Sequence, residues 1–375
     1  IPLRATPSPA PAAMTPVGAL DGFGPVARRV IVAAAIAVVV LAARAAADLA
    51  VPILLALFVA ILAAEPLGWM RQRGVPKYLA LGVVGVVLVD VGSLIALVVT
   101  GALEGLQDNL PTYQERLSLL TTELGRWLEG LGVGKADAAV PDLLDPRLLG
   151  QVVRTGLANA GSVFGLGFLV FLAVMFMLSE APAIPAKLHL ALGGADETEG
   201  RLREIAAAIK RYMLIKTLMS ILTAVVIFAW LSVLGIRFAP FLAILAFLLN
   251  FIPFVGAIMM MVPAILLALL EADVATAGLV AVGYVVANAA IGSVLEPRVM
   301  GRGLGISTLT AFLSLVFWGW VFGTLGLFLS VPLTMALITM LAAHPETRPI
   351  AILLGPEAPP PAAEPDAEGR RPGEV

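Results

Sequence analysis

The chain has 375 residues, of which 60% are hydrophobic and 13% are charged, and its formal net charge is −2. Soluble domains carry about 25% charged residues, so this composition indicates a protein that folds in lipid. The small net charge excludes the basic surface that nucleic-acid binding needs. The chain contains no cysteine and only two, widely separated histidines, His189 and His344, which excludes disulfides, thiolate catalysis and a zinc site of the His-Glu-x-x-His kind. We therefore expect no cofactor and no nucleic-acid partner.

The hydropathy pattern predicts an all-α polytopic membrane protein with about eight hydrophobic segments, two of them broken or re-entrant hairpins, and a helical extracytoplasmic insert. The lipid bilayer is therefore an expected partner. In chain order we expect a disordered N-terminal tail (1–26), transmembrane segments 1–3 (27–103), the insert (104–158), a transmembrane core (159–343) containing broken segments 239–271 and 306–343, and a disordered C-terminal tail (344–375).

Basic residues orient the first segments. Arg28 and Arg29 precede an apolar run at 30–43, which favours a first spanning helix with a cytoplasmic N-terminus. The run also resembles a secretory signal peptide, but a second apolar run follows almost at once and favours the spanning helix. The basic loop at 71–77 then lies in the cytoplasm. The pattern predicts a multi-pass inner-membrane protein with both termini cytoplasmic.

Two carboxylates are candidates for ion or proton coupling in these first segments. Asp90 lies near the centre of the third span, 79–103, where a lone carboxylate is costly. It could relay a proton or cation, pair with Arg44 or Lys216, or line a wet cavity. Glu65 ends the second span and could favour a cation partner, although an interfacial glutamate is commonly solvated.

The polar segment after the third span predicts a helix. Its leucines and tryptophan recur at intervals of three and four between Leu117 and Leu131, with Asn109 and Pro111 at the start and glycines at the end. This helix could form an oligomer contact, cover a transport path, or pack on the membrane surface or on its own chain. Further along, a short surface helix is expected to end at Tyr212, followed by a separate span at 215–234.

The first broken segment carries the polar interruption Asn250-Phe251-Ile252-Pro253-Phe254-Val255-Gly256. The arm before it would be roughly 20 Å long as a helix, too short for a bilayer core of about 30 Å. Pro253 removes an amide donor and frees carbonyls near Leu249, while Gly256 allows a close backbone approach. The segment is either one kinked, tilted helix or two half-helices that meet inside the membrane.

The second broken segment is interrupted at Trp318-Gly319-Trp320 and at Gly323-Thr324-Leu325-Gly326. Its Val331-Pro332 pair echoes Val262-Pro263, which hints at two related units. If both segments are hairpins, the arginines that follow them face the cytoplasm, as the positive-inside rule requires.

Interrupted membrane helices are where transporters place their substrate sites. Asn250 and Asn288 offer neutral donors and acceptors, or alternatively bind neighbouring helices. Glu296 could take a proton or pair with Arg298. The predicted transport residues are Asn250, Pro253, Gly256, Asn288, Glu296, Gly323 and Gly326, and the predicted coupling residues are Asp90, Glu65 and Glu296.

An ordered set of motifs over about residues 30 to 345 resembles the autoinducer-2 exporter family of bacterial inner-membrane transporters. The motifs are Pro52-Ile-Leu-Leu-Ala56 with Glu65-Pro66, Gly74-Val-Pro76, Asn250-Phe-Ile-Pro253-Phe-Val-Gly256, Asn288, Glu296-Pro297-Arg-Val-Met-Gly301-Arg-Gly-Leu-Gly305, Gly323-Thr-Leu-Gly326 and Val331-Pro332-Leu333.

The resemblance implies a multispan transporter with a variable extracytoplasmic insert that forms a homo-oligomer. It also implies export of autoinducer-2, a quorum-sensing molecule, or sodium/proton antiport. The sequence departs from the family pattern at three places: Lys216 stands where the family often has a glutamine, Glu65-Pro66 replaces an Asn-Pro pair, and Asp90 lies outside the usual motifs.

Two classes of function follow. The first is a secondary transporter that exports a small polar metabolite such as autoinducer-2, or exchanges a monovalent cation for protons. The second is a non-transporting membrane scaffold or sensor, or an intramembrane enzyme. An enzyme is not expected, because Ser162 has no histidine at membrane depth to activate it. The two helix breaks favour the transporter.

Overall fold

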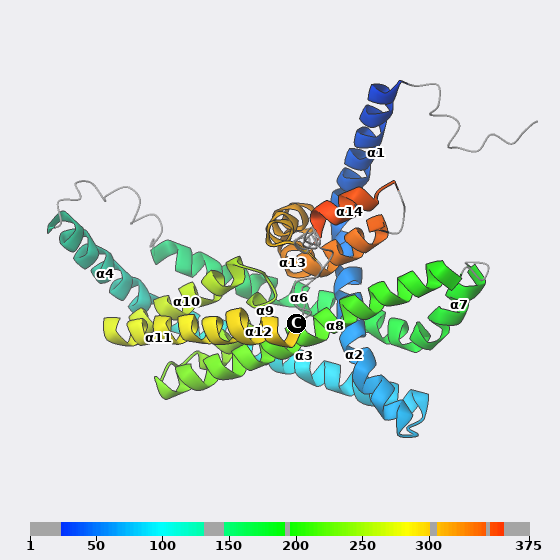
Figure 1. The fold of residues 1–375 in the computed structure, drawn as a ribbon. Coiled ribbons are helices and arrows are strands. Elements are labelled where there is room, and N and C mark those ends of the chain that lie inside the picture. Colours follow the sequence, from blue (N-terminus) through cyan, green and yellow to red (C-terminus); the bar gives the residue numbers. More distant parts are fainter. Residues whose placement is uncertain (1–23, 131–145, 192–195, 301–305, 343–345, 356–375) are drawn as a thin grey trace, which may run out of the picture. The chain divides into compact units, whose positions relative to one another are not determined.

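We describe the chain from a computed structural model that covers residues 24–130, 146–191, 196–300, 306–342 and 346–355. Within these ranges the regular structure is helical and contains no strand (Figure 1). Contacts divide the chain into two units, residues up to Ala50 and residues from Val51 onward, which are treated separately. Most of the two expected disordered tails, 1–23 and 356–375, lies outside the described residues.

The first unit contains helix α1 (Pro25–Ala45) and the first residues of helix α2 (Ala47–Gln72). A proline opens α1, where its missing amide donor costs nothing. The apolar part of α1, Val30–Ala45, is roughly 24 Å long at 1.5 Å per residue, somewhat less than a bilayer core.

Six helical stretches are long and apolar enough to cross a membrane among the described residues. They are α2, α3 (Lys77–Asp108), most of α6 (Pro146–Glu180), the second part of α8 (Asp196–Val233), α11 (Val274–Ala287) continued through α12 (Glu296–Met300), and α13 (Thr308–Ala342). With α1 and the broken segment 239–271, they match the predicted hydrophobic segments. The protein is an all-α polytopic membrane protein.

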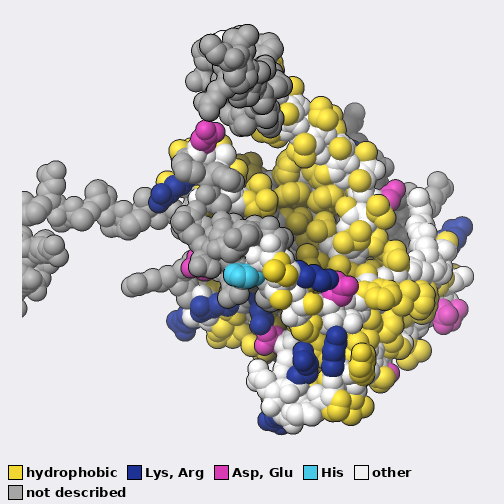
Figure 2. All heavy atoms as spheres, turned by 90° about the vertical axis from the view of Figure 1, so that its right-hand side faces the viewer, with side chains coloured by type: hydrophobic (Ala, Val, Ile, Leu, Met, Phe, Trp, Pro, Cys, Tyr) yellow, Lys and Arg dark blue, Asp and Glu magenta, His cyan; other side chains and the backbone are white. Residues whose placement is uncertain are grey.

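The outer surface agrees with a lipid environment. Figure 2 shows a broad area of hydrophobic side chains on one face, with several lysine and arginine side chains gathered below it. On α3, for example, Val86, Val87 and Leu97 are all more than half exposed. Exposed apolar side chains in such numbers need hydrocarbon or another apolar partner around them.

The first broken segment is a helical hairpin. Helix α9 (Ala239–Leu249) ends at Asn250, and helix α10 (Val255–Glu271) begins five residues later. The backbone amide of Arg237, just before α9, donates to the Glu271 carboxylate at the end of α10 at 3.1 Å. Since the entry and exit of the segment are hydrogen-bonded to each other, two half-helices are observed, and the single tilted helix is wrong.

The second broken segment also folds back on itself within α13. Gly323 adopts φ 65° and ψ −146°, a conformation open only to glycine, and divides the segment into two arms. The arms meet where the Trp318 indole N–H donates to the Thr334 hydroxyl at 2.9 Å. Ser307, before the first arm, donates its amide to the Leu354 carbonyl at 3.3 Å, beyond the second arm. The chain just before this hairpin therefore contacts the end of the helix that follows it.

Leu354 belongs to a short helix, α14 (Arg348–Leu354), in which Ala351 is buried. The sequence predicts disorder there, because the chain becomes proline-rich and polar beyond His344. The contact with Ser307 supplies the packing that the local sequence lacks.

Helix α8 corrects another expectation. The chain from Asp196 to Val233 is one continuous helix and not a surface helix followed by a separate span. Its composition changes from charged to apolar near Ile215, but no proline or glycine interrupts it after Gly200. A change of solvent along a helix does not end the helix, because each turn is closed by its own backbone hydrogen bonds.

The predicted amphipathic helix is present as α4 (Leu110–Gly130). Tyr113 and Leu117 are buried in a core that α4 shares with α9, α10 and α11. The Tyr113 hydroxyl donates to Glu271 at 3.1 Å, and the Arg116 guanidinium donates to the Leu270 carbonyl at 2.7 Å. The start of α4 therefore packs on its own chain, at the base of the first hairpin, opposite its tip.

Smaller elements complete the described chain. A 3₁₀ turn (Ala181–Ala183) and helix α7 (Ile184–Ala191) follow α6. The Lys77 ammonium donates to the Ser179 carbonyl at 2.8 Å, which joins the start of α3 to the end of α6. Small side chains from α2 and α3, such as Ala56, Ala60 and Ala80, form a second core with α6.

Candidate functional site

A line of polar side chains runs along one face of α8. Tyr212, Lys216, Ser220 and Thr223 are spaced four, four and three residues apart, so they share a face of the helix. All four are buried, between 0% and 8% exposed. Buried polar groups in a membrane helix need partners, because neither lipid nor an apolar core can hydrogen-bond them.

The partner of Lys216 is Glu296, which lies at the start of α12. The Lys216 ammonium donates to both oxygens of the Glu296 carboxylate, at 2.8 Å and 3.0 Å. The two side chains are only 10% and 15% exposed. The sequence offers Arg298 as the partner of Glu296, and that expectation is wrong, because α8 brings Lys216 closer than a residue on the same short helix.

Ser220, one turn further along α8, holds the first hairpin. The Asn250 amide group donates to the Ser220 hydroxyl at 2.9 Å. Asn250 is the first residue after α9, so this bond fixes the tip of the hairpin to the middle of α8. The predicted Asn250 and Glu296 thus meet two residues of the same α8 face.

The hairpin tip itself is strained. Phe254 adopts φ 60° and ψ −56°, and the Val255 amide donates to the Pro253 carbonyl at 2.6 Å. These are the features of the rare γ-turn with positive φ. The Leu249 carbonyl, expected to be freed by Pro253, accepts the Ile252 amide at 2.9 Å instead. Pro253 therefore shapes the turn rather than exposing that carbonyl.

A glycine closes each hairpin near its tip. A methyl group on Gly256 would collide with the Leu249 carbonyl oxygen, and one on Gly326 would collide with the Trp318 carbonyl oxygen. In both hairpins, the start of the second arm approaches the backbone of the first arm. The resemblance of the two units, suggested by their Val-Pro pairs, extends to this contact.

The two hairpins meet at an aromatic contact. The Phe251 ring, in the first tip, lies 4.4 Å from the Phe328 ring in the second arm of α13. Phe58 of α2 packs against both rings, with centroid distances of 5.5 Å and 5.0 Å. The two interruptions predicted from the sequence are therefore close in space.

Asn288 begins an unexpected element. Residues Asn288–Leu295 form a π-helix between α11 and α12. Such wider turns are rare and occur frequently at functional sites. The Asn288 side chain lies against Gly292 and takes no part in the hydrogen bonds of Lys216 or Asn250 among the described residues. Its contribution is to open the π-helix that leads into Glu296.

The other predicted coupling residues lie elsewhere. Glu65 forms an ion pair with Lys210, in which both side chains are more than 40% exposed. Asp90 is exposed on α3, and Lys216 is not its partner because Glu296 holds Lys216. Neither carboxylate joins the polar cluster on α8.

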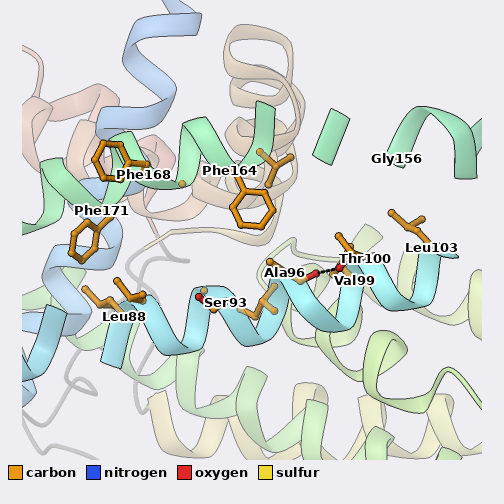
Figure 3. Close-up of a pocket in the computed structure, with 15 residues that line it drawn as sticks. Leu88, Ser93, Ala96, Val99, Thr100, Leu103, Gly156, Phe164, Phe168 and Phe171 are labelled. Atoms are coloured by element: carbon orange, nitrogen blue, oxygen red, sulfur yellow. Dashed lines mark hydrogen bonds between the residues drawn. The ribbon is translucent and has the colours of Figure 1, made fainter. Parts of the chain in front are cut away.

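A crevice of about 470 Å³ lies between α3 and α6 (Figure 3). Phe164, Phe168 and Phe171 face Leu88 and Val99 across it, and the Thr100 hydroxyl donates to the Ala96 carbonyl at 2.7 Å. None of its lining residues is charged, and none is a predicted site residue. The crevice therefore offers contact to hydrocarbon and little to a polar solute.

Sequence reasoning missed Tyr212, Ser220 and Thr223, and it noted Lys216 as a departure from the family pattern and as a possible partner of Asp90, not as the partner of Glu296. A signal was present, because four polar residues at helical spacing inside an apolar span are unusual. Their partners, 30 and 80 residues further along the chain, carry no such signal.

Several apolar spans, two hairpins that meet, and a buried polar cluster at the tip of one of them define the class of the protein. Broken helices around a polar site at membrane depth are typical of secondary transporters.

Comparison with known proteins agrees. The model of the AI-2E family transporter matches residues 30–346, and the chain belongs to this family. It is a membrane transporter, a multi-pass protein of the bacterial inner membrane.

Three curated proteins are similar to this chain. The AI-2 transport protein TqsA of Escherichia coli is 33% identical over 339 residues, covering 90% of this chain and 97% of the relative. A putative transport protein of Haemophilus influenzae is 34% identical over 328 residues, covering 86% and 94%. A sodium-lithium/proton antiporter of Halobacillus andaensis is 23% identical over 310 residues, covering 76% and 87%.

Proposed function

We propose that the protein exports a small, polar, hydroxylated metabolite such as autoinducer-2. The observation that carries this proposal is the buried polar cluster of Lys216, Ser220, Asn250 and Glu296, where a hairpin tip meets the middle of a spanning helix. Similarity to an AI-2 transport protein over nearly the full length of both chains supports the choice of solute.

The geometry suggests how a solute is exchanged. A hydroxylated molecule can replace the bond between Asn250 and Ser220, because a hydroxyl group both donates and accepts. Release of that bond frees the tip of the first hairpin from α8. Movement of the tip, with the aromatic contact at Phe328 as its other support, then opens the cluster to one side of the membrane.

The orientation forms part of the same proposal. Both termini and the loop at 71–77 lie in the cytoplasm, and the insert that contains α4 lies outside. The bond of Lys77 with Ser179, and the bonds of α4 with the residues around Glu271, support this arrangement, because each joins segments expected on one side. The protein works as a homo-oligomer.

Flux in reconstituted vesicles tests the function. Vesicles loaded with autoinducer-2 should lose it faster when they contain the wild-type protein than when they contain the double variant Ser220→Ala with Asn250→Ala. Lys210→Gln, which removes the lysine of the exposed pair with Glu65, serves as the control and should retain flux. Equal efflux from protein-free vesicles would contradict the proposal and favour a scaffold or sensor.

Sodium/proton antiport is the second candidate. It is favoured by the antiporter relative and by the carboxylate of Glu296 at the cluster. In the same vesicles, antiport predicts sodium uptake driven by a pH gradient, which Glu296→Gln and Asp90→Asn should abolish. Unchanged sodium movement in both variants would exclude these carboxylates as coupling groups.

A further inference from the structure

The polar cluster is electrically balanced by its own residues. Lys216 supplies one positive charge and Glu296 one negative charge, and the other described residues of the cluster, Tyr212, Ser220 and Asn250, are neutral. The charged pair is nearly enclosed, so water contributes little to its solvation. Among the described residues of this cluster, no charge is left uncompensated for a ligand.

The carboxylate is also occupied geometrically. Sodium and lithium ions are coordinated by oxygen atoms, including carboxylate oxygens, and these oxygens must contact the ion directly. Both oxygens of Glu296 already accept hydrogen bonds from the Lys216 ammonium, at 2.8 Å and 3.0 Å. A monovalent cation would have to displace that ammonium or sit beside it, and two like charges in an enclosed place repel strongly.

A neutral ligand meets no such obstacle. The Thr217 hydroxyl, adjacent in sequence to Lys216, is buried without a hydrogen-bond partner among the described residues. An unpaired buried hydroxyl is costly and gains from a ligand hydroxyl that can donate to it or accept from it. The Asn250–Ser220 bond offers a second pair of neutral groups.

We propose that Lys216 is a built-in counter-ion that selects for uncharged solutes. Its ammonium occupies the place that a transported cation would take on Glu296, so the cluster binds a neutral, hydroxylated molecule and does not require sodium. This inference rests on the proposed export function for its solute, but its central claim concerns cation binding and can be tested without flux.

Thermal unfolding in detergent tests the claim directly. The wild-type protein should melt at the same temperature in sodium, lithium and choline chloride of equal ionic strength. Lys216→Gln leaves the Glu296 carboxylate without its counter-ion and should gain a sodium- or lithium-specific rise in melting temperature, roughly 3 °C when the cation exceeds its dissociation constant about 100-fold.

Two controls isolate the carboxylate. Lys210→Gln removes a lysine from the exposed pair with Glu65 and should show no cation-specific rise. The double variant Lys216→Gln with Glu296→Gln should lose the rise. If Lys216→Gln does not fold, Lys216→Arg keeps the positive charge and should remain indifferent to sodium.

Flux gives a second, separable outcome. Autoinducer-2 efflux from wild-type vesicles should be the same with and without a sodium gradient, whereas Lys216→Gln efflux should become sodium-dependent. A sodium-specific shift in wild-type melting, or no shift in folded Lys216→Gln, overturns the inference. Absence of efflux under every condition overturns the proposed function, while the melting comparison still decides the role of Lys216.

Discussion

Lys216 and Glu296 illustrate how burial in a membrane protein changes the effect of a single ion pair on stability. Removing one member of a buried pair leaves an uncompensated charge and costs about 3–5 kcal/mol, whereas an exposed pair contributes at most about 1 kcal/mol. Two lysines of α8 illustrate the contrast among the described residues, because Lys216 and Glu296 are largely buried whereas Lys210 and Glu65 are both substantially exposed.

We expect Lys216→Met and Glu296→Gln each to lower the free energy of unfolding by about 3–5 kcal/mol. The double variant should lose clearly less than the sum, because no buried charge remains. Denaturant unfolding in detergent measures all three variants. The same cycle on Lys210 and Glu65 provides the exposed reference, and additive losses at Lys216 and Glu296 would contradict the pairing.

Tyr113 gives a prediction about pH. Burial, the charge of Glu271 and the hydrogen bond to it raise the pKa of Tyr113 to about 12. Since an unfolded tyrosine titrates near pH 10, the unfolded chain loses its proton first, and the stability contributed by this site is complete below about pH 10 and lost as pH rises toward about 12.

Unfolding measured from neutral to alkaline pH should therefore show a steeper decline for wild type than for Tyr113→Phe over that interval. The difference in tyrosinate absorbance between the two proteins should have its midpoint near the raised pKa. A midpoint near pH 10 would mean that α4 does not pack on Glu271.

Among the elements, the two hairpins depend on close approach at glycine. A side chain at Gly256 or Gly326 would meet a backbone carbonyl oxygen of the opposite arm, and a backbone cannot rotate away as a flexible side chain can. We expect Gly256→Ala and Gly326→Ala to destabilise by about 1–3 kcal/mol, the usual cost of overpacking.

Gly278→Ala in α11 is the matched control, because a methyl group there meets open space. This variant should gain up to about 1 kcal/mol from helix propensity. Thermal unfolding of the three variants in one detergent checks the contrast. Equal melting temperatures for all three would show that the hairpin arms are not in contact at their tips.

The hairpins also mark what the sequence can reveal. Pro253, Gly256 and Gly323 interrupt helices for local reasons, so both breaks were predictable, and charge placement favoured hairpins. The π-helix at Asn288–Leu295 was not predictable, because none of its residues demands a wider turn. The continuity of α8 was missed for the opposite reason, since a change of polarity near Ile215 resembles a boundary.

The pairing of Lys216 with Glu296 was even harder to predict from the sequence. The two residues are 80 positions apart, and Arg298 is much closer to Glu296 in sequence. Only the packing of α8 on α11 and α12 selects the partner. The Trp230 indole of α8 donates to the Leu279 carbonyl of α11 at 3.0 Å, at the other end of the contact between these two helices.

On the scale of the whole molecule, the contact between Phe251 and Phe328 joins two segments that the chain separates widely. The sequence contains no cysteine, so an introduced pair has no background. We expect Phe251→Cys with Phe328→Cys to be joined rapidly by a short bis-methanethiosulfonate reagent that spans the space of the two removed rings, and the cross-link to block efflux until it is reduced.

Phe254→Cys with Phe328→Cys is the control for this experiment. The Phe254 side chain is 54% exposed and belongs to the same tip, so its pair should cross-link much more slowly. Similar rates for both pairs would indicate that the tip has no fixed position against α13.

The γ-turn at Phe254 has a kinetic consequence. A non-glycine residue held at φ 60° stores about 1–3 kcal/mol, and the Val255–Pro253 hydrogen bond keeps it in place only while the turn is closed. If all of this strain energy is released before the tip reaches its open state, the tip opens roughly 5- to 150-fold faster than a tip with an unstrained turn would. The turnover number of the protein would then be set partly by one backbone angle in the hairpin tip.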